Sequence, residues 1–266
     1  MARSAMLVTV QIHPEGPRYG ASLVFLPGLW VGSDVWRGPA TFFGHRGWQG
    51  TLVDLRGVPG GIAARGRAVA EIVSRIPGRV VLAGHDAGAL VALAAAGHES
   101  VAALVLVSPL VAGSAATHTL TWSWGLVWAA MRRRLVAPPR GPLADAAFAD
   151  LPETFRRTLA SDDAATVAEI GRRDRLERPA TLPPTLILHG DADPLLRPHD
   201  ARRLAEDLGA DARELSGAGH WPIAGPAWQT CVRQAHRWLV QRLGEGLLEL
   251  YPEAMAERDD ADEEPS

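Results

Sequence analysis

Two amino acids are missing from this sequence altogether. All 27 residues of the Lys and Arg class are arginine, and asparagine does not occur. Without lysine, the chain has no P-loop lysine, no lysine to form a Schiff base with pyridoxal phosphate and no catalytic lysine. Without asparagine it has no N-glycosylation acceptor. Both amino acids use codons that begin with AA, so their absence indicates a GC-rich genome, which we expect to be bacterial.

Cysteine is nearly absent as well, and Cys231 is the single example. One cysteine excludes internal disulfides and any metal site built from several cysteines. Cys231 lies among apolar residues at helical spacing, which favours a buried structural thiol over a nucleophile. The sequence has no His-Glu-x-x-His run and no phosphate-binding loop, so we expect neither a metal nor a cofactor.

Long apolar runs and a strong net charge are also lacking. No run reaches the roughly 18 apolar residues that a membrane span requires, and the apolar stretch 5–10 is too short for the core of a signal peptide. We therefore expect a cytoplasmic protein. The formal net charge of −3 argues against nucleic acid as the main partner.

The length and composition fit one large α/β domain with an insertion. The chain has 266 residues, of which 47% are hydrophobic, and this is ample for a sizeable core. Charge is unevenly distributed, because residues 252–266 carry seven acidic residues and one arginine. We predict that residues 251–266 form an acidic, disordered tail that aids solubility.

Short β-like runs alternate with helical patterns in the first and last parts of the chain. The predicted strands are 7–12, 22–26, 50–54, 79–83, 101–107, 185–189 and 212–215. The predicted helices are 63–75, an alanine-rich helix ending near 97, 200–208 and about 225–248. Continuous Val- and Leu-rich strands joined through helices are typical of a parallel sheet covered on both faces. The predicted fold class is therefore α/β, with a mostly parallel, doubly wound sheet.

Residues 111–184 have a different character. They contain three tryptophans, the triplet Arg132 to Arg134 and a Pro- and Gly-rich stretch at 138–142, but no β-like run. We predict that this segment is a helical insertion. The predicted domains are an α/β core formed by 1–110 and 185–250, a helical cap formed by 111–184, and the tail.

The strongest local signal is the pentapeptide Gly84-His85-Asp86-Ala87-Gly88, which follows a buried strand and begins a helix. A strand that turns into a helix within a few residues crowds its central residue, so the neighbouring residues must be very small. The central side chain is then held out at the top of the sheet, beside the positive end of the helix. This arrangement favours Asp86 as a nucleophilic carboxylate, although Asp86 would also serve as a simple helix cap.

Two further polar loops follow predicted strands. Residues 190–194 carry Asp191 and Asp193, and residues 217–222 carry His220 between glycines and a tryptophan. In an open α/β sheet, ligands bind where the carboxyl ends of the strands meet. We therefore expect Asp86, an acid and His220 to lie at one edge, where a carboxylate can orient the histidine as a general base.

Together these motifs resemble the α/β-hydrolase family over about residues 20–250. The stretch 25–30 resembles the family's strand and oxyanion turn, although Pro27 replaces the usual His, and 54–57 resembles its Asp-x-Arg-Gly loop. Residues 111–184 lie where the family inserts a cap. The resemblance implies that the backbone N–H groups of Leu29 and Ala87 form an oxyanion hole. It also favours Asp193 over Asp191 as the acid, since Asp193 fits the Gly-x-x-Asp turn.

Most of the family has serine where this chain has Asp86. Haloalkane dehalogenases, fluoroacetate dehalogenases and soluble epoxide hydrolases have aspartate there, so the chain resembles this Asp-nucleophile branch. That resemblance implies attack at an sp³ carbon, followed by hydrolysis of an Asp86 ester by water that His220 activates. The groups with which these subclasses activate substrate are missing. Epoxide hydrolases use tyrosines of the cap to protonate the epoxide oxygen, but Tyr19 and Tyr251 lie outside the cap. Dehalogenases have Trp or Arg directly after the nucleophile, where this chain has Ala87.

Several other residues are candidates for the substrate pocket. Trp124 and Trp128 are four residues apart and share one face of a predicted helix, where they would offer indole N–H groups or simply pack the cap. His118 is a candidate proton donor, with cap packing as the alternative, and His85 is expected to pack or bond beneath the site. The full set of candidates is Trp30, His85, His118, Trp124, Trp128 and Trp221.

Three functions remain open from the sequence. The first is hydrolysis of a small organic molecule through the Asp86 ester, and the second is a lyase in natural-product biosynthesis that uses Asp86 and His220 as acid and base. The third is a ligand-binding protein without turnover, against which the complete set of Asp86, Asp193 and His220 argues. We place hydrolysis first, because the fold is most often found in hydrolases.

Overall fold

The computed structural model describes residues 8–14, 16–112, 114–121, 129, 131–132, 134–171 and 179–248. Its centre is a seven-stranded sheet with the order β1-β3-β2-β4-β5-β8-β9. The strands are β1 (Thr9–Ile12), β2 (Ala21–Leu26), β3 (Gln49–Val53), β4 (Arg79–His85), β5 (Val101–Val107), β8 (Thr185–Gly190) and β9 (Asp211–Leu215). Every neighbouring pair is parallel except β1 and β3, which are antiparallel at one edge. The predicted α/β fold class is confirmed.

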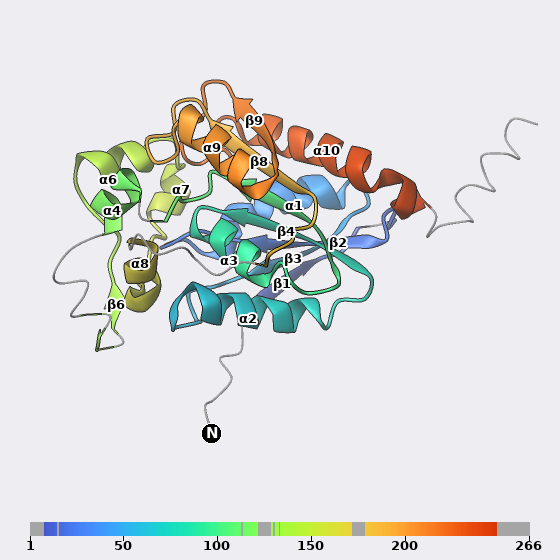
Figure 1. Cartoon of the computed structure of the whole chain (residues 1–266), viewed down its shortest axis with the longest axis horizontal. Coiled ribbons are helices and arrows are strands. Elements are labelled where there is room, and N and C mark those ends of the chain that lie inside the picture. Colours follow the sequence, from blue (N-terminus) through green and yellow to red (C-terminus); the bar gives the residue numbers. More distant parts are fainter. Residues whose placement is uncertain are drawn as a thin grey trace, which may run out of the picture.

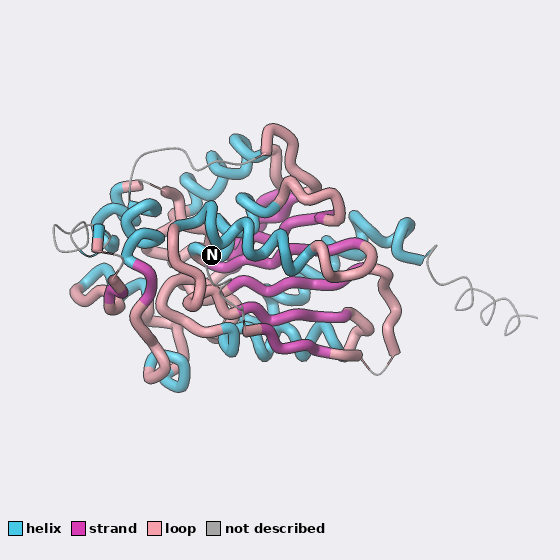
Figure 2. The backbone as a smooth tube through the Cα atoms, turned by 90° about the horizontal axis from the view of Figure 1, so that it is seen from below, coloured by secondary structure: helices cyan, strands magenta, loops and turns pink. Residues whose placement is uncertain are grey.

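Helices cover both faces of the sheet (Figures 1 and 2). On one face lie α2 (Gly61–Val73), α3 (Ala87–Ala95) and α9 (Pro198–Leu208), and on the other lie α1 (Arg37–Gly44) and α10 (Trp228–Leu248). Alternate strand residues serve the two cores, as β5 illustrates: Leu104 and Leu106 join one cluster, and Ala103, Val105 and Val107 join the other. This alternation explains the nearly continuous apolar sequence of the central strands.

The chain between β5 and β8 forms short elements beside the sheet (Figure 1). These are α4 (Ala115–Thr121), β6 (Leu135–Val136), α6 (Pro142–Ala147), α7 (Glu153–Arg156), β7 (Asp162–Asp163) and α8 (Ala164–Gly171). The expectation of no strand in this segment is wrong, because β6 and β7 pair in antiparallel fashion. Two-residue strands are too short to produce an alternating pattern, and β7 consists of two aspartates. Trp122, Trp124 and Trp128 lie outside the described residues, as does the acidic tail.

Two other features complete the fold. Helix α1 and the 3-10 helix Ser33–Trp36 that precedes it were not predicted from the sequence. Cys231 is buried on α10, as expected, and burial raises the pKa of its thiol to about 12. Within the described part of the chain, the helices are all too short or too polar to cross a membrane.

Candidate active site

Asp86 occupies the sharp turn between β4 and α3. Its backbone has φ 56° and ψ −122°, a conformation that residues other than glycine rarely adopt. A Cβ atom at Gly84 would collide with the backbone of Gly88, and a Cβ at Gly88 would collide with the carbonyl of Leu26. The two glycines are therefore needed for close backbone approach, and they allow the strained turn to pack against β2.

Backbone strain is concentrated around this turn. Among the described residues, the non-glycine residues with positive φ are Trp30, Asp86 and Ser108. They lie just beyond the carboxyl ends of β2, β4 and β5, which are neighbours in the sheet. Strained residues cluster at functional sites in many proteins, so this edge is the candidate site. Ser108 was not predicted, because its sequence context resembles an ordinary strand end.

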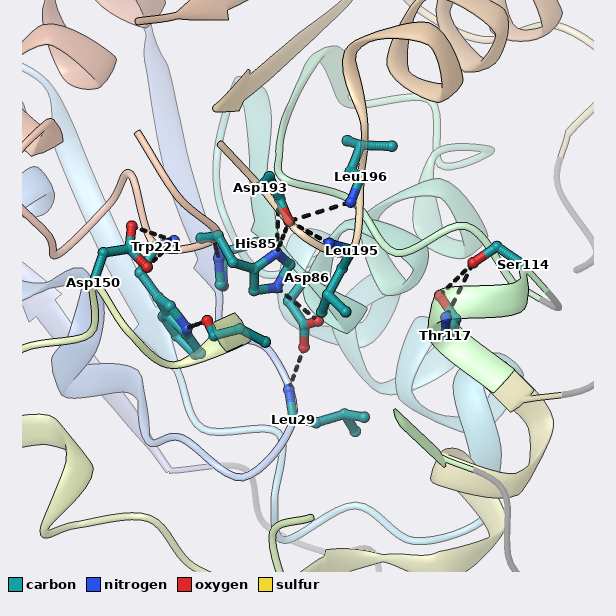
Figure 3. A network of polar contacts seen from close by, with 12 residues as sticks. Leu29, His85, Asp86, Ser114, Thr117, Asp150, Asp193, Leu195, Leu196 and Trp221 are labelled. Atoms are coloured by element: carbon teal, nitrogen blue, oxygen red, sulfur yellow. Dashed lines mark hydrogen bonds and ion pairs between the residues drawn. The ribbon is translucent and has the colours of Figure 1, made fainter. Parts of the chain in front are cut away.

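The two carboxylate oxygens of Asp86 have different partners (Figure 3). Oδ2 accepts a hydrogen bond of 2.7 Å from the backbone N–H of Leu29, and Oδ1 lies 3.3 Å from Nε2 of His220. Gly28 allows this approach, because a Cβ there would collide with the Asp86 side chain. Asp86 as a whole residue is only 5% exposed to solvent. Leu29 thus lies where the sequence analysis expected an oxyanion donor, but its N–H is bound to Asp86 itself.

His220 connects Asp86 to a second carboxylate. Its Nδ1 lies 3.1 and 2.9 Å from the two oxygens of Asp193, and Asp193 also accepts the backbone N–H groups of Leu195 and Leu196. The contact assigns a proton to Nδ1, since a carboxylate can only accept. Asp191 instead accepts the backbone N–H of Gly217. Of the two candidate acids, the structure brings Asp193 to the histidine.

The three side chains form a buried charge triad. Burial opposes a charge on His220, but Asp193 and Asp86 outweigh it and raise the pKa of the imidazole to about 10. Burial would raise the pKa of Asp86, but the hydrogen bond and the charge of His220 lower it. At neutral pH the site therefore holds a protonated His220 between two carboxylates.

His85 and Trp221 lie behind the triad. Nε2 of His85 donates to the carbonyl oxygen of His220 at 2.8 Å, and its ring centroid lies 4.4 Å from that of Trp221. Burial and the charge of His220 lower the pKa of His85 to about 4, so this ring is neutral. Trp221 is buried and donates its indole N–H to the carbonyl of Ala147 at 2.9 Å. These two hydrogen bonds hold the loop that carries His220 and Trp221.

The remaining pocket candidates are less closely tied to the triad. Trp30 is buried on the loop after β2, and its indole N–H has no hydrogen-bond partner among the described residues. His118 is half-buried on α4, and Figure 3 shows Thr117 of the same helix, with Ser114 just before it, to the side of the triad. Trp124 and Trp128 lie outside the described residues, so the structure does not place them.

The aspartates that anchor the site loops were not predicted from the sequence. Asp150 accepts the backbone N–H of Trp221 at 3.1 and 3.3 Å, and burial raises the pKa of its carboxyl. Asp162 accepts the backbone N–H of Trp30 at 3.1 Å. Each pair joins residues far apart in the sequence, so no local pattern could reveal it. Within the described ranges, there is no group of three or more His, Cys, Asp or Glu side chains arranged to hold a metal ion.

The chain is similar to known proteins of one family. The family model described as the alpha/beta hydrolase family matches residues 23–229. No curated protein matches the chain. The solved structure of Paleococcus ferrophilus monoacylglycerol lipase has a TM-score of 0.68 at 19% identity, with 89% of this chain and 99% of that chain covered.

Two other solved structures share the fold at similarly low identity. A malate-bound thermophilic esterase from Thermogutta terrifontis has a TM-score of 0.64 at 18% identity, covering 88% of this chain and 93% of that chain. The alpha/beta hydrolase GrgF from Penicillium sp. sh18 has a TM-score of 0.67 at 15% identity, covering 90% and 99%. At such identities the likeness extends to the fold and not to the substrate.

Proposed function

The chain belongs to the alpha/beta hydrolase family and is a hydrolase, and from that premise we propose that it cleaves a small organic molecule through a covalent ester of Asp86. One observation carries the proposal: His220 lies between the carboxylates of Asp86 and Asp193, which hold it protonated. The resting site therefore offers a charged nucleophile but no free base. A reaction that begins with attack by Asp86 suits this state.

In the first step, Oδ1 of Asp86 attacks an electrophilic sp³ carbon. A new C–O bond forms as the bond to the leaving group breaks, and the leaving group takes the bonding electrons, either as a departing halide or as an alkoxide that stays attached to the adjacent carbon of an epoxide. Oδ2 is bound to the N–H of Leu29 at 2.7 Å, whereas the contact of Oδ1 with Nε2 of His220 is longer, at 3.3 Å, so we assign the attack to Oδ1. In the resulting ester, Oδ2 becomes the carbonyl oxygen and keeps the Leu29 hydrogen bond.

Formation of the ester also turns His220 into a base. It removes the negative charge of Asp86, so His220 loses one of the two carboxylates that raise its pKa. His220 then releases a proton, which protonates the alkoxide of an opened epoxide or passes into solution with a departing halide. Asp193 continues to orient the neutral ring through Nδ1. The order of the two steps thus follows from the electrostatics of the triad.

In the second step, His220 takes a proton from a water molecule that attacks Cγ of Asp86. The electron pair of the carbonyl moves to Oδ2, where the Leu29 N–H stabilises the charge, and such a donor contributes a factor of about 10²–10³ to the rate. The intermediate then collapses, the Cγ–O bond to the product breaks, and the product alkoxide takes the hydroxyl proton of the intermediate. Asp86 is again a carboxylate and His220 is again protonated.

The same geometry argues against two other reactions. An ester substrate that uses the oxyanion hole needs the Leu29 N–H for its own carbonyl, but Asp86 Oδ2 holds that donor. Elimination needs a base, whereas the pKa of Asp86 is lowered and His220 is protonated. A substrate with an sp³ carbon and a good leaving group, such as an alkyl halide or an epoxide, fits best.

The test is intact-protein mass spectrometry of His220→Gln after incubation with pooled epoxides, haloalkanes and activated esters. Without its base, the variant should retain the ester, and the added mass should map to Asp86. The control is the double variant Asp86→Ala with His220→Gln, which should stay unlabelled. If the wild-type enzyme consumes an electrophile that leaves His220→Gln unlabelled, covalent catalysis by Asp86 is ruled out. Turnover of only acidic C–H substrates would favour the lyase.

A further inference from the structure

A buried ion pair joins the segment after α7 to the core. Arg65 on α2 and Asp162 on β7 form a salt bridge in which the side chains are 1% and 0% exposed. Nε of Arg65 also donates to the carbonyl oxygen of Val58 at 3.1 Å. A buried pair of this kind is costly to desolvate, so its retention requires further bonds that satisfy both partners. The second carboxylate oxygen of Asp162, Oδ2, binds the backbone of Trp30 next to the candidate site.

Both backbone polar groups of Trp30 are bound by residues 160–162. The N–H of Trp30 donates to Oδ2 of Asp162 at 3.1 Å, and its carbonyl oxygen accepts the N–H of Ala160 at 2.9 Å. Trp30 has a φ of 63°, in the left-handed region that favours glycine. Bonds at both ends of the residue therefore hold it in a conformation that the isolated loop would not keep.

The neighbouring aspartate strengthens the same junction. Oδ2 of Asp163 accepts the backbone N–H of Gly60 at 3.1 Å and both the backbone N–H and the hydroxyl of Thr166 at 2.9 and 2.8 Å. The Asp163 N–H donates to Oδ1 of Asp162 at 2.7 Å. The paired aspartates of β7 thus bind the loop before α2, the start of α8 and the loop after β2.

Leu29 and Trp30 direct consecutive N–H groups to two different carboxylates. The Leu29 N–H binds Asp86 at 2.7 Å, and the Trp30 N–H binds Asp162. We propose that Asp162, held by Arg65, is a positioning residue that fixes the Trp30 backbone and so aims the Leu29 N–H at Asp86. The effect that this positioning should have on the catalytic rate rests on the proposed function, hydrolysis through an ester of Asp86. The segment between β5 and β8 then completes the oxyanion site.

The proposal assigns a step-specific role to Asp162. The Leu29 N–H stabilises the charge that forms on Oδ2 when water attacks the ester, whereas ester formation removes charge from Asp86. Misplacing this donor should slow hydrolysis of the ester more than its formation. The covalent ester should then accumulate during turnover. A purely structural role for Asp162 predicts instead a smaller active fraction with no accumulation.

A matched pair of double variants tests the hydrogen bonds that Asp162 accepts from the backbone, of which the Trp30 bond is the one that leads to Leu29. Arg65→Met with Asp162→Asn removes both buried charges and keeps an acceptor for the Trp30 N–H, whereas Arg65→Met with Asp162→Leu removes the charges and the acceptor. We expect the leucine variant to have a kcat at least about tenfold below that of the asparagine variant, in line with loss of one oxyanion donor. Intact mass should show the Asp86 ester in the leucine variant during turnover.

Hydrogen exchange of the Leu29 and Trp30 amides provides a readout that needs no substrate. Exchange should be faster in the leucine variant than in the asparagine variant. Equal exchange and equal kcat in the two would overturn the positioning role, whether or not an ester forms. Faster exchange together with an unlabelled His220→Gln protein would keep the positioning role and reject the covalent ester.

A second variant covers the case in which the leucine protein does not fold. Ala160→Pro leaves the ion pair intact and removes the N–H that binds the Trp30 carbonyl oxygen. Ala160 is half-buried in a loop, so the protein should fold, with thermal unfolding as the check. Faster exchange at Leu29 and a lower kcat would support the proposal, and wild-type values of both would overturn it.

Discussion

At the residue scale, Asp191 and Asp193 form a natural comparison, because they lie two residues apart in one loop. Asp193 is buried against His220, whereas Asp191 is exposed and bonds the backbone of Gly217. Asp193→Ala should lower kcat by about 10²–10⁴-fold, because the histidine loses the partner that orients it. Asp191→Ala should stay within about threefold of the wild type. Steady-state kinetics of the two variants checks this, and a larger loss in Asp191→Ala would contradict the assignment.

Stability between neutral and alkaline pH reports on His220. Because its folded pKa of about 10 lies above the ordinary value of 6.5, the protonated ring stabilises the fold fully below about pH 6.5, and this contribution is lost as pH rises through about 10. The Tm of the wild type should therefore fall from pH 7 to pH 10. The chain contains no lysine, so few other groups titrate in this range.

His220→Gln is the control for this pH dependence. Its Tm should fall less over the same interval, because glutamine has no proton to lose. Thermal unfolding of both proteins in matched buffers makes the comparison. Parallel curves would show that His220 is not held protonated in the folded state.

Some of the candidate site residues could be predicted from the sequence. Asp86, Asp193 and His220 each follow a predicted strand, so their common edge could be predicted from the parallel sheet alone. The charge state of His220 could not be predicted, because it depends on distances and burial. Asp162 and Arg65 were missed for a similar reason, since 97 residues separate them and neither belongs to a motif.

At the element scale, the turn from β4 to α3 depends on space rather than on helix capping. Asp86 precedes α3 but makes no side-chain cap hydrogen bond to it. The glycines at 84 and 88 let the turn pack against the backbone of the neighbouring segments. This agrees with the crowding argument made from the sequence and disfavours the view of Asp86 as a simple cap.

A pair of glycine substitutions tests this packing. Gly88→Ala should destabilise the protein by about 1–3 kcal/mol, because its Cβ would collide with backbone atoms that cannot move aside. Gly57→Ala should change the stability by less than about 0.5 kcal/mol, since the site is exposed and no atom lies within 4 Å of the added carbon. Urea denaturation of both variants provides the measurement. Equal stabilities would contradict the close-approach argument.

Elements differed in how well the sequence predicted them. The strand at 101–107 was predicted with the bounds of β5, because its apolar run has clear limits. Helix α1 was missed, since its sequence RGPATFFG contains Gly and Pro and has little helical pattern. Strand β7 was missed because two buried aspartates look like a polar loop, and only the tertiary bonds to Arg65, Trp30 and Thr166 account for their burial.

At the scale of the whole molecule, the sheet gathers residues from distant parts of the chain at one edge. Leu29 follows β2, Asp86 follows β4, and Asp193 and His220 follow β8 and β9. The loops therefore meet at one edge although they are far apart in the sequence, as Figure 3 shows for Leu29, Asp86 and Asp193. The segment between β5 and β8 also anchors two of these loops, because Asp150 binds the loop of His220 and Asp162 binds the loop of Leu29.

This arrangement suggests different roles for the sheet and for the segment between β5 and β8. We propose that the loops of the α/β sheet supply the nucleophile, the histidine and the oxyanion donor, and that residues 111–184 act as a cap that holds two of these loops in place. Substrate choice would then depend on the same segment. The alternation of strands and helices predicted the sheet, but the anchoring contacts of the cap have no signature in composition or period.

The most direct test of the central claim is reaction in ¹⁸O-labelled water, first as a single turnover with enzyme in excess and then over many turnovers, followed by mass analysis of the product and of the peptides that contain Asp86 or Asp193. If water attacks Cγ of an Asp86 ester, the product leaves with the original Oδ1, and Asp86 acquires one labelled oxygen. We predict label in the Asp86 peptide, none in the Asp193 peptide, and unlabelled oxygen in the product of the first turnover. Labelled product from the first turnover with an unlabelled Asp86 would contradict the covalent mechanism.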